Sequence, residues 1–490
     1  MNRMLALLLP LCSLLVSATS QSSTLDRDRD PVVLTGSDLP SLAELAPSVV
    51  VAFRHQGGWV QIPVQIDERD IVTFNQVYGG GYPAADIDVE TYTDPGTYVG
   101  ADSNPLFDAN DELVFMARDA GDVAPVVASP PAGVVAGSGV QLTINDSLDG
   151  GSGYVYLFES EGSLTPDAGA DYVSYAFNLL AGIYPDDYDL ANGPNPEASS
   201  VVTALYETEF TDRWIRPVTK VKAGAATGVD ILDRHKSLFE PGNCIRTEET
   251  FSNGEGAFFA NIDGPVRAIR SYMGANSGPF SQRRHIFYEG RQDITAFLRV
   301  HAINGMLDVY DYSPAAIGMT YSNSLNTGGV TIDGVPDSVT PGLHTWEMVT
   351  GAQGTLIMAG TIDTDIAPLP TITSYYDDDD KPTNKQCTGD DFEYGQSGLW
   401  ITSGIPNTDP SMDPFNHATG WRNVYYEEPG RTVADAATRA LQAATPLDVT
   451  ASAFPSSNEA PVLSPPALLC LAGLLLGIGV RFRGSRSLIS

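Results

Sequence analysis

A group of cationic and aromatic side chains is the first feature of this 490-residue chain that could do chemistry. It consists of Arg283, Arg284, His285 and Tyr288, in a chain with 61 acidic and only 27 basic residues. Arginine can hold a carboxylate through two hydrogen bonds. A neighbouring histidine or tyrosine can remove the proton alpha to that carboxylate and protonate the leaving oxygen. One interpretation is therefore a polysaccharide lyase that acts on acidic glycans, with these four residues as its catalytic group.

The same four residues also have a structural interpretation. Successive side chains of a strand point to opposite faces, so His285 and Tyr288 diverge if this segment is a strand. The arginines then serve to neutralise nearby carboxylates. We expect this structural role, and the question of catalysis stays open, with lyase-like chemistry as the alternative if the protein is an enzyme.

An acidic loop is the second candidate site. Oxygen atoms of several side chains must converge to bind Ca²⁺. The loop offers five such residues in eleven positions, namely Asp102, Asn104, Asp108, Asn110 and Glu112. It lacks the glycine at the sixth position of an EF-hand loop. Calcium is the one cofactor we predict, and a solvated loop held by Asx turns is the equal alternative.

Other chemistries find no matching motif. The six histidines are scattered without His-x-x-x-His spacing, and no Cys-x-x-Cys pair occurs. The sequence Gly-Ala-Asn-Ser-Gly at 274–278 places its serine one position too late for a nucleophile elbow. Five tryptophans offer flat surfaces for sugar rings or for packing, namely Trp59, Trp214, Trp346, Trp400 and Trp421.

Short strand patterns dominate the elements that must position these residues. The runs 49–54 and 59–67 flank a glycine turn, and Val60 to Ile66 alternate in polarity as a hairpin strand does. A helix is expected over 432–443, capped by Thr432. The pattern predicts a mainly β protein with one or two antiparallel β-sandwich-type domains and a single C-terminal helix. We expect domains at 21–195 and 196–450, followed by a linker at 451–461.

The two ends predict export and membrane attachment. Residues 1–20 have the basic start, apolar core and small-residue end of a signal peptide. Cys12 lies in that apolar core, where a lipid-bearing cysteine is the alternative. Residues 462–480 are an uncharged apolar run long enough to cross a bilayer, and the basic tip 481–490 is expected on the cytoplasmic side. The protein is therefore expected on the outer side of the inner membrane.

The last 30 residues resemble a known family of sorting signals. A proline-containing segment (Pro461 to Pro466), an apolar helix and an arginine cluster (Arg481, Arg483, Arg486) together are similar to a bacterial PEP-CTERM tail. In place of the usual Pro-Glu-Pro core this chain has Ser464-Pro465-Pro466. The resemblance implies a sorting protease of the exosortase type as a partner, and release to the cell surface or the medium after processing.

Cysteine and charge content narrow the function of the body. Only Cys244 and Cys387 lie between the two ends, and in an exported domain they are expected to form a disulfide. Removing the four arginines of the ends from the net charge of −34 leaves −38 for residues 21–461. Such a surface repels nucleic acid. The sequence thus favours a surface protein that binds a glycan or builds an extracellular matrix.

Overall fold

The computed structural model describes residues 22–75, 87–125, 128–180, 195–254, 256–382 and 385–454. The protein is mainly β, with several antiparallel sheets, as the sequence predicted. The expected signal peptide, membrane segment and basic tip lie outside the described residues. Within those ranges, no helix combines the length and the apolar character needed to span a bilayer.

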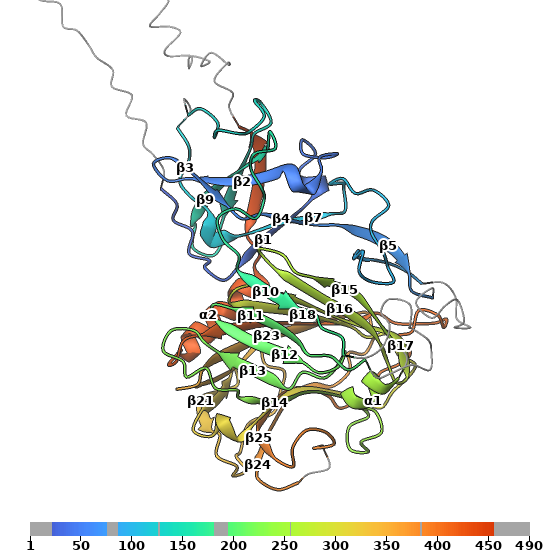
Figure 1. Cartoon of the computed structure of the whole chain (residues 1–490). Coiled ribbons are helices and arrows are strands. Elements are labelled where there is room, and N and C mark those ends of the chain that lie inside the picture. The colour runs from blue at the N-terminus through green and yellow to red at the C-terminus, as the bar shows by residue number, and fades with distance from the viewer. Residues whose placement is uncertain are drawn as a thin grey trace, which may run out of the picture.

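An N-terminal module contains three sheets (Figure 1). The largest has the order β27 (Asp448–Ala453), β8 (Val140–Asn145), β9 (Ser152–Glu159), β2 (Val50–His55) and β3 (Trp59–Ile62). The second has the order β1 (Pro31–Thr35), β7 (Glu112–Met116) and β4 (Gln65–Asp67). The third pairs β5 (Arg69–Thr73) with β6 (Asp88–Tyr92). The expected hairpin is present, because β2 and β3 pair with Ala52 opposite Ile62.

The main body is built on a nine-stranded sheet. Its order is β15 (Ala257–Ile262), β16 (Ala268–Ala275), β17 (Gly278–Phe287), β18 (Arg291–Phe297), β26 (Ala418–Glu427), β23 (Gly354–Thr364), β22 (Trp346–Gly351), β20 (Thr320–Asn323) and β21 (Asn326–Thr331). Two four-stranded sheets pack on one face of it and complete a sandwich. Sheet F is β10 (Val173–Ala176), β11 (Ser199–Thr203), β12 (Tyr206–Phe210) and β13 (Val218–Val221). Sheet H is β14 (Leu232–Phe239), β19 (Met306–Tyr312), β25 (Glu393–Ile401) and β24 (Ile372–Asp379).

Two α-helices occur in the described ranges. The expected C-terminal helix is α2 (Val433–Ala444), and the side chain of Thr432 caps it. Ala436 of α2 packs on Trp346 and Ile357 of the nine-stranded sheet, on the face opposite to sheet H. The short α1 (Glu248–Asn253) was not predicted. Four single-turn 3-10 helices lie wholly within the described residues: Gly36–Asp38, Pro47–Val49, Ala117–Asp119 and Pro314–Ala316.

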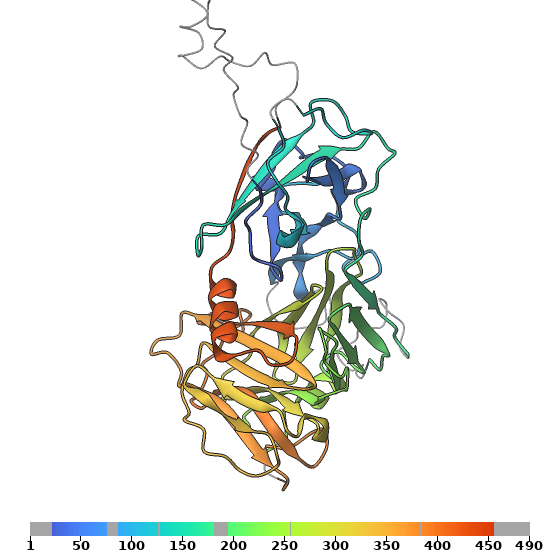
Figure 2. The same cartoon turned by 90° about the vertical axis from the view of Figure 1, so that its left-hand side faces the viewer.

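The chain crosses between the module and the main body more often than the sequence suggested. The strand β10 pairs with β11, so the boundary expected between residues 195 and 196 falls inside one sheet. The strand β27 was not predicted, and its residues 451–453 were expected in the linker. It returns to pair with β8 of the N-terminal module. Figure 2 shows this return beside α2. The C-terminal segment therefore connects the main body back to the N-terminal module.

The disulfide between Cys244 and Cys387 is present, as predicted. It joins the segment after β14 to the segment before β25, across 143 positions of sequence. Closing so long a loop restricts the unfolded chain, which stabilises the fold by up to about 5 kcal/mol on the chain-entropy model.

We expect the double variant Cys244→Ser with Cys387→Ser to lose a free energy of unfolding of up to about 5 kcal/mol, because its unfolded chain regains that freedom. Equilibrium unfolding in urea measures the loss. Reduction of the unsubstituted protein is the matched control and should produce a similar change. An unaltered midpoint in both samples would contradict a stabilising role.

Candidate functional site

One partly buried carboxylate, that of Asp308 on β19, contacts side chains of three other strands of the sandwich. Its Oδ1 accepts a hydrogen bond from Nε2 of His235 at 3.0 Å and forms an ion pair with Nη1 of Arg422 at 2.8 Å. Nη2 of Arg422 donates to the backbone carbonyl of Asp308 at 3.0 Å. Its Oδ2 accepts from Oγ of Ser237 at 2.8 Å and from the guanidinium of Arg283. These partners come from β14, β26 and β17. The carboxylate therefore ties sheet H to the nine-stranded sheet.

The charges and the burial of this cluster determine the protonation states of Asp308 and His235. Burial alone would raise the pKa of Asp308, but the two guanidinium groups and His235 hold that pKa well below its usual range. Burial, with the two guanidinium charges, lowers the pKa of His235 to about 3, against the attraction of Asp308. The imidazole is therefore neutral at pH 7 and donates its Nε2–H to the ionised carboxylate.

This arrangement differs from a hydrolytic triad. In a triad the histidine lies between the serine and the carboxylate and takes the proton of the serine. Here Ser237 and His235 both donate to Asp308, which stands in the middle. Ser237 is 1% exposed. The cluster is thus suited to holding strands and charges in place rather than to activating a nucleophile.

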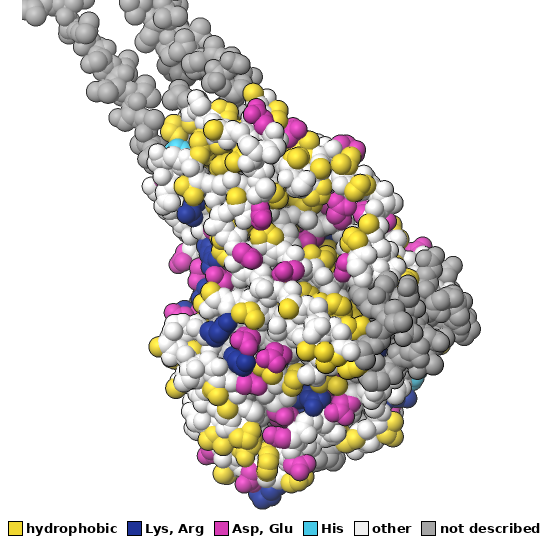
Figure 3. Space-filling view, in the orientation of Figure 1, with side chains coloured by type: hydrophobic (Ala, Val, Ile, Leu, Met, Phe, Trp, Pro, Cys, Tyr) yellow, Lys and Arg dark blue, Asp and Glu magenta, His cyan; other side chains and the backbone are white. Residues whose placement is uncertain are grey.

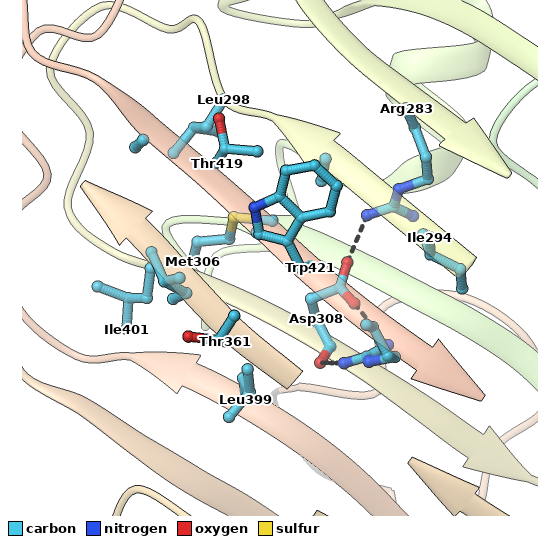
Figure 4. A pocket seen from close by; sticks show the side chains of 15 residues that line it. Arg283, Ile294, Leu298, Met306, Asp308, Thr361, Leu399, Ile401, Thr419 and Trp421 are labelled. Atoms are coloured by element: carbon cyan, nitrogen blue, oxygen red, sulfur yellow. Dashed lines mark hydrogen bonds and ion pairs between the residues drawn. The ribbon is translucent and has the colours of Figure 1, made fainter. Parts of the chain in front are cut away.

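A cavity of about 90 Å³ opens beside this cluster, between sheet H and the nine-stranded sheet (Figure 4). Arg283, Asp308 and Arg422 close its polar end. The rest of the lining is mainly aliphatic: Ile294, Ala296, Leu298, Met306, Ile362, Leu399, Ile401 and Ala418, with Thr361, Thr419, Gly420 and Trp421.

Small residues on neighbouring strands create this space. Gly420 of β26 pairs with Ala296 of β18 on one side and with Ile362 of β23 on the other. A Cβ added to Gly420 would meet no atom closer than 4.0 Å. The missing side chain at position 420 therefore leaves room that a ligand could use.

Trp421 is the exposed aromatic residue of the site. It borders the cavity and is 42% exposed, whereas Trp214 and Trp346 are each 5% exposed and pack in the core. Strand alternation places Trp421 and Arg422 on opposite faces of β26. Trp421 therefore projects from the face of β26 opposite to Arg422, and its exposed indole offers a flat apolar surface there.

The four residues predicted to be catalytic do not lie together in the structure. Arg283 lines the cavity. His285 projects from the same face of β17 but is 1% exposed, with Nε2 3.1 Å from the hydroxyl of Tyr272 and Nδ1 2.9 Å from the amide of Gln292. Arg284 lies on the opposite face, over the ring of Tyr92.

Tyr288 does not line the cavity either. It packs with Val114 and Met116 of the N-terminal module and is 1% exposed. The alternation expected for a strand therefore separates the set, and only Arg283 reaches the cavity.

The acidic loop forms a hydrogen-bonded turn. Asp102 accepts from the backbone of Asn104, whose side chain donates to Asp108 at 3.0 Å. The backbone of Asn110 donates to Asp108. Glu112 points elsewhere, because it pairs with Arg69 and Arg267.

These contacts form Asx turns, and they leave the calcium prediction untested. Among the described residues, no group of three or more His, Cys, Asp or Glu side chains is arranged to hold a metal ion. The pKa of nearby Glu68 is raised to about 7 by burial and by the charges of Asp111, Asp102 and Asp108.

Only part of the site could be predicted from local sequence signals. Asp308 and His235 are 73 positions apart, and Asp308 and Arg422 are 114 apart, so their meeting depends on strand order rather than on local spacing. The run Gly420-Trp421-Arg422 was the available local signal, because a glycine inside a strand often marks the close approach of another group.

Comparisons with known proteins do not assign a family. No protein-family model matches the chain, and no curated protein matches it. Among solved structures, the chain is similar to a protein from Escherichia coli K12 assigned as an aldose 1-epimerase. That likeness covers 52% of this chain and 99% of the other, at 10% identity and a TM-score of 0.25. A likeness at this level carries no argument about fold or function.

Acid should destabilise the protein partly through His235. Between pH 6.5 and about 3 the unfolded chain binds a proton at this histidine and the folded protein does not, so stability falls as pH drops through that window. The His235→Gln variant keeps a hydrogen-bond donor for Asp308. In this window we expect it to reduce the change in the free energy of unfolding with pH by about 1.4 kcal/mol per pH unit. Urea unfolding at several pH values measures it, and unchanged slopes would refute a neutral buried histidine.

The raised pKa of Glu68 has the opposite consequence. The folded protein holds this proton between pH 4.5 and about 7, so the contribution of Glu68 to stability falls as pH rises through that window. In EDTA, we expect the Glu68→Gln variant to gain melting temperature over the unsubstituted protein when the pH is raised from 5 to 8. If added calcium abolishes the gain in melting temperature, the result supports a calcium site in the acidic loop. If calcium leaves the gain unchanged, the result supports a loop held by Asx turns.

Proposed function

We propose that this protein is exported and binds a neutral glycan at the cavity beside Trp421, without changing the glycan covalently. The observation that carries the proposal is a small, mainly aliphatic cavity with one charged end, lined in part by the exposed Trp421. Pockets of this kind, mostly apolar with a few fixed polar groups, are the usual form of small-ligand sites.

The charge of the protein favours a neutral ligand. Figure 3 shows acidic side chains spread over the visible face among fewer basic ones, and the body carries a net charge of −38. A polyanion approaching such a surface is repelled. At the polar end of the cavity, Asp308 pairs with both Arg283 and Arg422 and offsets one of their two positive charges.

Glycan binding is better supported than glycan cleavage by a lyase. A lyase needs a group that can accept a proton within reach of the substrate. Of the predicted set, only Arg283 lines the cavity, and both His285 and Tyr288 are 1% exposed. The carboxylate of Asp308 is occupied on both oxygens and remains ionised.

The location proposed for this activity rests on the two ends and on the disulfide. Disulfides persist in oxidising compartments outside the cytoplasm, and the Cys244–Cys387 bond is consistent with export. The apolar segment 462–480 would hold the protein at the membrane until a sorting protease acts on the tail. A matrix polymer or a cell-surface glycan is then the natural partner.

Filling the cavity should weaken binding. We expect Gly420→Val to reduce retention on neutral glycans at least tenfold, because its side chain would enter the cavity, and its backbone lies outside the left-handed region that only glycine favours. Affinity electrophoresis through gels that contain neutral glycans or polyuronates measures retention.

Gly328→Val is the matched control for this experiment. It lies in β21 of the same sheet, away from the cavity lining, and an added Cβ there meets nothing within 4 Å. Equal retention of both variants would contradict the proposed site. Ultraviolet absorbance from an unsaturated product would instead establish a lyase.

A further inference from the structure

The lining of the cavity excludes a hydroxylated sugar ring from its interior. Apart from the charged end, the groups that face it are mainly aliphatic, including Ile294, Leu298, Met306, Leu399 and Ile401. A hydroxyl placed among them would lose its bonds to water without a replacement, which is costly for each buried hydroxyl. What enters the cavity must therefore be an apolar part of the ligand.

The size of the cavity limits that apolar part. An apolar cavity of about 150 Å³ holds a benzene molecule, which has six carbon atoms. The cavity here, at about 90 Å³, therefore has room for three or four heavy atoms. A sugar ring and a lipid chain are both too large, whereas an acetyl group, with three heavy atoms, fits.

One polar atom at the charged end lacks a partner among the described residues. The Nε of Arg283 is buried and forms no hydrogen bond, although its two Nη atoms donate to Ser237 and Asp308. Arg283 is 2% exposed and lines the cavity. Figure 4 shows its guanidinium directed toward Asp308 at the edge of the cavity. A buried donor of this kind calls for an acceptor, such as a carbonyl oxygen.

We propose that the cavity is a subsite for an O-acetyl group on a neutral glycan. The methyl group packs against the aliphatic lining, the ester carbonyl accepts a hydrogen bond from Nε of Arg283, and the sugar ring stays outside the cavity at the border marked by Trp421. This inference rests on the proposed function and specifies which chemical group of the glycan is recognised.

The test compares one polymer in two states. Acetylated glucomannan, and the same preparation after mild alkaline removal of its acetyl groups, are titrated against the full-length protein by isothermal calorimetry. Because burying a few apolar atoms and pairing a buried donor both add affinity, we expect the acetylated polymer to bind at least about tenfold more tightly.

Two variants assign that preference to the cavity. Gly420→Val should bring the affinity for the acetylated polymer down to that for the deacetylated one. Arg283→Lys keeps a positive charge beside Asp308 but removes the Nε donor, so it should reduce the preference as well. Gly328→Val is again the control, and thermal unfolding of each variant verifies that it is folded.

The outcomes separate the two proposals. Tighter binding of the acetylated polymer that Gly420→Val abolishes supports the subsite. Equal binding of both polymers overturns the acetyl subsite and leaves glycan binding intact. Binding of neither polymer overturns the inference, and failure of every neutral glycan in the retention assay overturns the proposed function with it.

Discussion

The buried charge cluster around Asp308 is the constraint on which the rest of the site depends. An ionised carboxylate inside a protein is costly unless it is paired and hydrogen-bonded. Asp308 meets this condition through partners on β14, β17 and β26. Because these strands belong to two different sheets, satisfying the charge also fixes the separation and register of the sheets at this point.

The cavity is a consequence of that fixed separation. The small residues Ala296, Ala418 and Gly420 leave space between the sheets. Because the cluster holds the sheets apart, sheet H cannot move closer to fill that space. Close-packed interiors rarely leave such space without a reason. The same guanidinium groups that hold Asp308 thus form one wall of the cavity, which couples the stability of the sandwich to the shape of its candidate binding site.

Local patterns predicted the elements well and their partners poorly. The alternation around Val60 to Ile66 and the cap at Thr432 depend on neighbours in sequence, and both the hairpin and α2 are present. The disulfide followed from counting cysteines. By contrast, the meeting of Asp308 with His235 and Arg422, and the return of β27 to β8, depend on pairings across long stretches of chain. Those pairings leave no spacing signal in a single sequence.

The Met306 methyl group offers the most direct test of whether the cavity is the ligand site. Met306 lines the cavity, whereas Met348 packs beneath α2 on the other face of the nine-stranded sheet. In protein labelled with ¹³C at the methionine methyl groups, the account predicts that acetylated glucomannan shifts the Met306 resonance and leaves that of Met348 unchanged. Saturable binding with no change at Met306 would place the ligand elsewhere and contradict the account.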